Sequence, residues 1–161
     1  MLGEPRSTVD IDLAIVLREG SIPDLVRALE PTFFIDLESA REAVRRGSHF
    51  NVLHRETMLK VDLFVLGDSA FDREQIRRRI RVAVSPDSPQ LVAVSSPEDL
   101  VLRKLAWYRA GGGVSDRQWR DVLGVLKVQR GRLDVAYLRR WSGTLGISEL
   151  LERVIEESAS G

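Results

Sequence analysis

The β-rich runs of this 161-residue chain all lie before residue 97, and amphipathic helical patterns fill the remainder. Runs of β-branched and aromatic residues predict strands at 8–16, 32–37, 49–54, 58–66 and 91–96. Only three residues separate the third run from the fourth, and this short spacing predicts an antiparallel hairpin. The first part of the chain is therefore expected to form a sheet.

Helices are predicted between and after these strands. Their patterns occupy 21–30, 38–47 and 72–79, and four further helices are expected from residue 97 to the end. Ser21 is expected to cap the first helix, and Gly47 to end the second. Ser96 and Ser115 are expected N-caps of later helices, because Ser96 precedes a proline and stands three residues before an acid.

The expected fold class is α/β (α+β). A nucleotidyltransferase-like mixed sheet with flanking helices is expected at 1–95, and a C-terminal helical region at 96–161 is expected to pack on it. A hydrophobic content of 43% and a charged content of 30% can support a core of that size.

The composition excludes several classes of protein. The formal net charge is zero, so no overall basic field indicates a nucleic-acid binder. Cysteine is absent from the sequence, which excludes disulfides and thiolate metal sites. No apolar run reaches the length of a membrane span, and acidic Glu4 within a polar start does not fit a secretory signal. We expect a cytoplasmic protein with no membrane partner.

Two aspartates alternate with apolar residues inside the first strand, TVDIDLAIV. Side chains at i, i+2 and i+4 of a strand point to one face, so Thr8, Asp10 and Asp12 share a face. A third acid, Asp62, lies in another apolar run, KVDLFV, and can join them if the two strands are neighbours. Carboxylates this close repel each other unless a cation neutralises them.

A hard divalent cation, Mg²⁺ or Mn²⁺, fits oxygen ligands of this kind and commonly binds one or two carboxylates together with substrate phosphates. Three acids on adjacent strands are the pattern of metal-dependent phosphoryl or nucleotidyl transfer. Asp10, Asp12 and Asp62 are therefore the predicted metal ligands and catalytic residues. In the alternative interpretation the acids are structural: Asp10 caps a turn, and Asp62 pairs with Lys60 or an arginine.

The segments GEPRSTVDIDL and KVDLFV together resemble the nucleotidyltransferase-fold superfamily, in particular small bacterial members that include the AbiEii-type toxin proteins. The resemblance covers most of the chain, because SPEDLVLRKL and RQWRDVLGVLK are similar to the helical region that follows the catalytic sheet in that family. It implies substrate-binding roles for four residues: Arg6 and Thr8 before the acid pair, Lys104 toward the nucleotide, and Asp121 in the helical region.

Family members carry a glycine-rich turn before the acid strand, where backbone N–H groups hold the triphosphate. Here only Met1 and Leu2 precede Gly3. Two expectations follow: either the chain starts at an internal methionine, or it is a trimmed relative without turnover. The glycines at 111–113 follow a helix and are interpreted as a helix stop and link.

The resemblance implies an enzyme that moves a nucleoside monophosphate from an NTP to a hydroxyl of a tRNA, a protein or a small molecule, in a toxin-like role. An antitoxin or a second copy of the chain is the implied protein partner. The alternative is a catalytically inert nucleotidyltransferase-like binding module. A purely structural helical adaptor is a third, weaker interpretation.

Three other groups of residues receive structural interpretations. The arginines of REQIRRRIR (Arg73, Arg77, Arg78, Arg79 and Arg81) could contact nucleic acid, but a solvated helix face is favoured. His49 and His54 are five residues apart, on opposite strand faces, so they are not expected to share a metal. The aromatic residues of the helical half, namely Trp107, Tyr108, Trp119 and Trp141, are expected to pack between helices.

Overall fold

The structure, a computed structural model, describes residues 11–83, 86–87 and 89–160. It divides into two compact units, Met1–Ser69 and Ala70–Gly161. The second unit therefore includes a helix and a pair of strands that stand before the predicted change from strands to helices at residue 96. Both units together form a mixed α/β structure with one four-stranded and one two-stranded sheet.

The sheet of the first unit has the strand order β1-β4-β3-β2. Its strands are β1 (Ile11–Ile15), β2 (Phe33–Ile35), β3 (His49–His54) and β4 (Lys60–Val65). Strands β1 and β4 are parallel, whereas β3 is antiparallel to both β4 and β2. The predicted hairpin of β3 and β4 is confirmed. Strands β1 and β4, which carry Asp12 and Asp62, are neighbours in the sheet.

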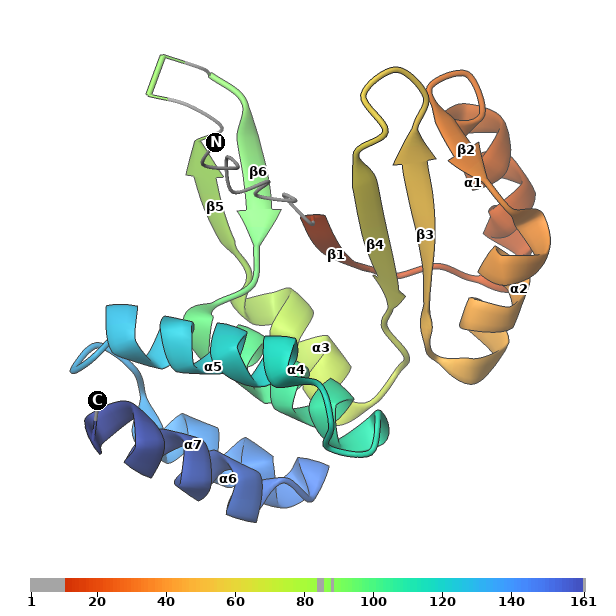
Figure 1. Cartoon of the computed structure of the whole chain (residues 1–161). Coiled ribbons are helices and arrows are strands. Elements are labelled where there is room, and N and C mark those ends of the chain that lie inside the picture. Colours follow the sequence, from red (N-terminus) through yellow and green to blue (C-terminus); the bar gives the residue numbers. More distant parts are fainter. Residues whose placement is uncertain (1–10, 84–85, 88, 161) are drawn as a thin grey trace, which may run out of the picture. The chain divides into compact units, whose positions relative to one another are not determined.

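Helices α1 (Ile22–Leu29) and α2 (Leu37–Arg46) lie side by side against this sheet (Figure 1). The core between sheet and helices consists of buried side chains from both: Ile22, Ala40, Ala43, Phe50, Val52, Val61, Leu63 and Val65. Along β4 the buried residues Val61, Leu63 and Val65 alternate with Lys60, Asp62 and Phe64. The alternation directs the second set to the opposite face of the sheet, which we call the open face; no described helix of this unit contributes to it.

Local capping explains where α2 begins and ends. Asp36 accepts a hydrogen bond of 2.7 Å from the backbone N–H of Ser39, and this bond holds the pKa of the Asp36 carboxyl below its usual value. Gly47 ends the helix with a φ of 59°, as predicted, because glycine adopts the left-handed region without strain. Ser21 stands at the start of α1 after a short 3₁₀ turn (Glu19–Ser21), but its side chain makes no capping hydrogen bond.

The second unit begins with α3 (Ala70–Arg78) and a two-stranded antiparallel sheet of β5 (Ile80–Ala83) and β6 (Leu91–Val94). Four helices follow: α4 (Pro97–Ala110), α5 (Asp116–Val128), α6 (Val135–Leu145) and α7 (Ser148–Ser160). They enclose a core that includes Leu102, Leu105, Val122, Leu138 and Leu151. Strand β5 was not predicted, because its four residues follow an arginine-rich helix without a break in polarity. No helix in the described ranges is long and apolar enough to cross a bilayer.

A buried carboxylate holds the start of α4 to α6. Asp99 is fully buried, and its two oxygens accept hydrogen bonds from Tyr137 Oη at 2.6 Å and Ser96 Oγ at 2.8 Å. The Ser96 hydroxyl in turn accepts from the Asp99 backbone N–H at 3.1 Å, which confirms Ser96 as the predicted cap. Arg78 adds charge to this cluster, because its Nε lies 3.5 Å from Asp99 and its guanidinium lies over the Tyr137 ring. Desolvation and the bond to Asp99 raise the pKa of the Tyr137 hydroxyl.

We expect Tyr137→Phe to lower the free energy of unfolding of the second unit by about 1–3 kcal/mol, because a buried carboxylate oxygen loses its donor. Urea denaturation followed by tryptophan fluorescence measures this unit, since Trp107, Trp119 and Trp141 all belong to it and are the only tryptophans of the chain. An unchanged free energy of unfolding would show that the hydrogen bond contributes nothing net.

The same variant gives a pH test. A hydroxyl whose pKa is raised on folding stabilises the fold fully below its unfolded pKa, about 10 for tyrosine, and loses that contribution as the pH rises. The stability difference between wild type and Tyr137→Phe should therefore be constant near neutral pH and shrink above about pH 10. Urea titrations at a series of pH values measure it, and a difference that persists unchanged at high pH would contradict the assigned pKa direction.

Candidate functional site

Asp12 and Asp62 face each other across the parallel strand pair. The register places Asp12 directly opposite Asp62, between the pairs Ile11–Val61 and Leu13–Leu63. Neighbouring strands lie about 4.8 Å apart, so the two carboxylates share the open face at close range. Asp12 is exposed, whereas the Asp62 side chain is only 15% exposed. Two of the three predicted acids therefore come together as predicted, while Asp10, Arg6 and Thr8 lie outside the described residues.

Asn51 extends this pair into a row of three polar side chains. It is opposite Asp62 on the other side of β4, in the antiparallel register with β3. Asn51 is not among the site residues predicted from the sequence. The signal was present in HFNVLH, where period-two alternation puts Asn51 on the face opposite to buried Phe50 and Val52. Its pairing with Asp62 depends on the hairpin turn, and the sequence pattern did not determine that register.

Lys60 stands beside Asp62 on the same strand face. Its Nζ lies 3.0 Å from Asp62 Oδ1, as an ion pair with a half-exposed lysine. That buried oxygen nevertheless accepts no hydrogen bond of good geometry. The contact is therefore a charge attraction between the ammonium and the carboxylate rather than a well-aligned hydrogen bond. This pairing is the one that the structural interpretation of Asp62 predicted.

The oxygen atoms of Asp12, Asp62 and Asn51 suit a hard divalent cation as ligands. Two carboxylates and an amide oxygen are the ligand types that Mg²⁺ and Mn²⁺ prefer, and the buried Asp62 Oδ1 accepts no hydrogen bond of good geometry, although Lys60 Nζ lies 3.0 Å away. Within the part of the chain that the structure describes, no three His, Cys, Asp or Glu side chains gather as a metal site. Asp12 and Asp62 are the residues that would hold the ion, with Asn51 beside them.

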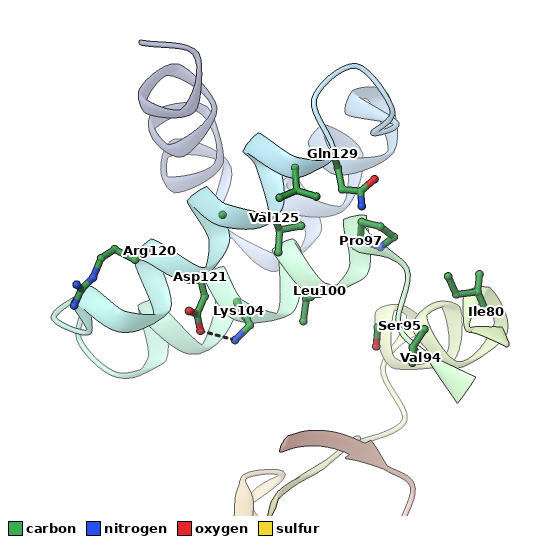
Figure 2. Close-up of a pocket in the computed structure, with 12 residues that line it drawn as sticks. Ile80, Val94, Ser95, Pro97, Leu100, Lys104, Arg120, Asp121, Val125 and Gln129 are labelled. Carbon is green, nitrogen blue, oxygen red and sulfur yellow. Dashed lines mark hydrogen bonds and ion pairs between the residues drawn. The ribbon is translucent and has the colours of Figure 1, made fainter. Parts of the chain in front are cut away.

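Lys104 and Asp121 come together in the second unit. Lys104 Nζ, from α4, lies 3.0 Å from Asp121 Oδ2, from α5 (Figure 2). The lysine is 9% exposed, and the aspartate side chain is 43% exposed. Both line a cavity of about 640 Å³, together with apolar residues that include Leu100 and Val125 and with Arg120. The two helical residues singled out by the family resemblance thus form one ion pair at a cavity.

The described arginines of the REQIRRRIR segment are partly committed to acids of the protein itself. Arg77 donates two hydrogen bonds to Glu74, at 2.8 and 2.6 Å, and this contact lowers the pKa of the Glu74 carboxyl. Arg78 pairs with Glu98 and Asp99. These contacts favour the structural interpretation for Arg77 and Arg78.

The expected packing roles of three aromatic residues are confirmed. Trp141 is buried in the core of the second unit, Tyr108 is buried beside Trp119, and Trp119 packs against that core. The two histidines lie on opposite faces of β3, as predicted. His49 stacks on Phe64, whereas His54 packs edge-on against Phe33.

Comparison with models of protein families and with curated proteins gives no match for this chain. The nucleotidyltransferase resemblance consequently remains an expectation based on the motifs quoted above. The structure itself contributes the juxtaposition of Asp12, Asp62 and Asn51 on one face of the sheet.

We expect Lys104 and Asp121 to be energetically coupled. A double-mutant cycle with Lys104→Met and Asp121→Asn should give a coupling of about 1 kcal/mol, above the few tenths common for exposed pairs, because the ammonium is buried. Urea denaturation with tryptophan fluorescence supplies the four stabilities. Additive effects of the two substitutions would show that the 3.0 Å contact carries no net interaction.

Proposed function

We propose that this chain is a metal-dependent nucleotidyltransferase, which moves a nucleoside monophosphate from an NTP to a hydroxyl of an acceptor. One observation carries the proposal: Asp12 and Asp62 are directly opposite on neighbouring parallel strands, on the open face of the sheet. Two carboxylates in this arrangement are costly unless a cation or a proton offsets their repulsion. The motif resemblance supports the same activity.

In the proposed reaction the acceptor hydroxyl oxygen forms a bond to the α-phosphorus, the bond from that phosphorus to the bridging oxygen breaks, and pyrophosphate leaves. Asp62, which is nearly buried, orients the hydroxyl and accepts its proton. Asp12 and Asp62 would hold Mg²⁺ or Mn²⁺, with Asp10 as the third predicted ligand. When bound, the ion supplies charge stabilisation for the phosphate oxygens.

The remaining residues take supporting roles in this proposal. Lys60 partly offsets the charge of Asp62 before a cation binds. Lys104, Asp121, Arg6 and Thr8 are the proposed contacts to the NTP, on the strength of the resemblance. The acceptor classes remain a tRNA, a protein or a small molecule, and a toxin-like role with an antitoxin or a second copy as partner belongs to the same proposal.

A second candidate function is a binding module of the same fold without turnover. The Lys60–Asp62 ion pair favours it, because a lysine at 3.0 Å can neutralise the acid without any metal. The two candidates differ in a measurable way, since only the enzyme needs a divalent cation at the acid pair.

We expect the protein to transfer label from an α-³²P-labelled NTP to an acceptor in a mixture of cell RNA, protein and small metabolites with Mg²⁺ or Mn²⁺. Asp12→Asn and Asp62→Asn should each reduce the rate at least about 100-fold, because each removes a charge that acts on the reacting phosphate. The four NTPs are tested separately, and the products are separated by gel and thin-layer chromatography.

Asp24→Asn is the matched control, because Asp24 is an exposed aspartate on α1 that pairs with neighbouring Arg27. It should leave the transfer rate unchanged. Absence of transfer with every NTP would support the binding module, and transfer that survives in Asp62→Asn would exclude the mechanism above.

Removal of the competing cation gives a test that does not need the acceptor. Lys60→Met should tighten the binding of Mn²⁺ by up to about fivefold, because the ion no longer competes with an ammonium beside Asp62. Asp62→Asn should abolish binding. Isothermal titration calorimetry measures both, and a wild-type protein that binds no Mn²⁺ at millimolar concentration would contradict the metal site.

A further inference from the structure

The open face carries aromatic groups on both sides of the polar row. Two residues along the strands from Asn51 and Asp62, the next pair on this face is His49 and Phe64. Their rings stack, with centroids 5.0 Å apart and planes 28° from parallel. His49 is exposed, so its outer ring face is available to a further flat group.

A second flat surface lies on the other side of the row. Phe34 on β2 is 48% exposed and is opposite Leu53 of β3, which is itself opposite Lys60 of β4. The guanidinium of Arg55 lies over the Phe34 ring, 4.2 Å from its centroid. Arg55 Nε donates a hydrogen bond of 2.8 Å to the carbonyl of Glu30, which holds the guanidinium over the ring.

These two surfaces are too far apart for one small flat ligand. Leu53 is four residues from His49 along β3, and Phe34 is one strand further. With about 3.4 Å per residue and about 4.8 Å between strands, the separation is about 14 Å. Stacked bases of one nucleic-acid strand lie about 3.4 Å apart, so one mononucleotide cannot occupy both surfaces, whereas a chain of nucleotides can.

The charges on the face are segregated in a way that suits such a chain. Lys60 and Arg55 stand at the Phe34 end, where they can contact phosphates. Asp12 and Asp62 occupy the middle row, where negative charge excludes a phosphate in the absence of a cation but accepts a hydroxyl. Aromatic rings and arginine planes that alternate with cations are the means by which proteins bind single strands without reading their sequence.

We propose that the open face of the four-stranded sheet binds a single-stranded polynucleotide, with one base on the His49–Phe64 stack, another on the Arg55–Phe34 layer, and a hydroxyl of the intervening nucleotides at Asp62. The inference that this hydroxyl is the acceptor rests on the proposed function. The binding surface itself does not, because it depends on ring stacking and on Lys60 and Arg55.

Fluorescence anisotropy with labelled eight-nucleotide RNA and DNA strands tests the surface directly, with and without Mg²⁺. Phe34→Leu and His49→Ala should each weaken binding by about fivefold or more, because each removes a stacking partner. Phe34→Tyr should bind with the affinity of the wild type, since the aromatic ring is kept. Lys60→Gln should reduce the dependence of affinity on salt by about one phosphate contact. A preference for RNA over DNA would assign a contact to the 2′-hydroxyl.

Two matched controls should bind as the wild type does. Val128→Ala truncates an exposed apolar side chain of the second unit, and Arg45→Gln removes a charge from α2, on the helical side of the sheet. Circular dichroism melts establish that Phe34→Leu and His49→Ala are folded. If either variant fails to fold, Arg55→Lys replaces it, because it removes the planar cation over Phe34 and should also weaken binding.

The outcomes separate this inference from the proposed function. Oligonucleotide binding that Phe34→Leu weakens, without nucleotide transfer, supports the surface and overturns the enzyme. Transfer to a protein or a small molecule without oligonucleotide binding supports the enzyme and overturns the surface. Equal binding by wild type, Phe34→Leu and His49→Ala overturns the surface, as does a wild-type protein that binds neither RNA nor DNA in the same assay.

Discussion

The register of β4 is the constraint on which the first unit depends. This strand lies between β1 and β3, and its alternating side chains give one face to the core and the other to Lys60, Asp62 and Phe64. A shift of one residue would exchange the two faces, burying the charges and exposing Val61, Leu63 and Val65. The burial of three apolar side chains thus also fixes the position of the acid row, although none of them belongs to it.

The second unit depends in a similar way on one buried charge. Asp99 would be costly in an apolar interior, and its hydrogen bonds to Ser96 and Tyr137 offset that cost. The contact with Tyr137 joins α4 to α6 across 38 residues of sequence. This polar contact therefore fixes α6 to the start of α4, within a unit whose helices otherwise meet through apolar side chains.

Much of this organisation could be predicted from the sequence, because it follows from local patterns. The strand at 49–54, the helix that Gly47 ends and the cap at Ser96 are found where the residues indicate them. The meeting of Asp12 with Asp62 could also be predicted, since both stand in apolar runs of one sheet. What could not be predicted depends on register or tertiary contact: Asn51 beside Asp62, Tyr137 on Asp99, and Arg55 over Phe34. Strand β5 was missed because it follows an arginine-rich helix without a break in polarity.

The parallel pairing of β1 with β4 also has a consequence for the order of folding. Fifty residues of sequence separate Asp12 from Asp62, and the hairpin of β3 and β4 is local by comparison. Closing a long loop costs entropy before any contact repays it, so non-local strand pairs tend to form late. The acid pair then comes into existence only when β1 joins a sheet that is otherwise assembled. A chain still growing or partly unfolded would carry both aspartates but no site, so any activity at that pair would report the completed fold.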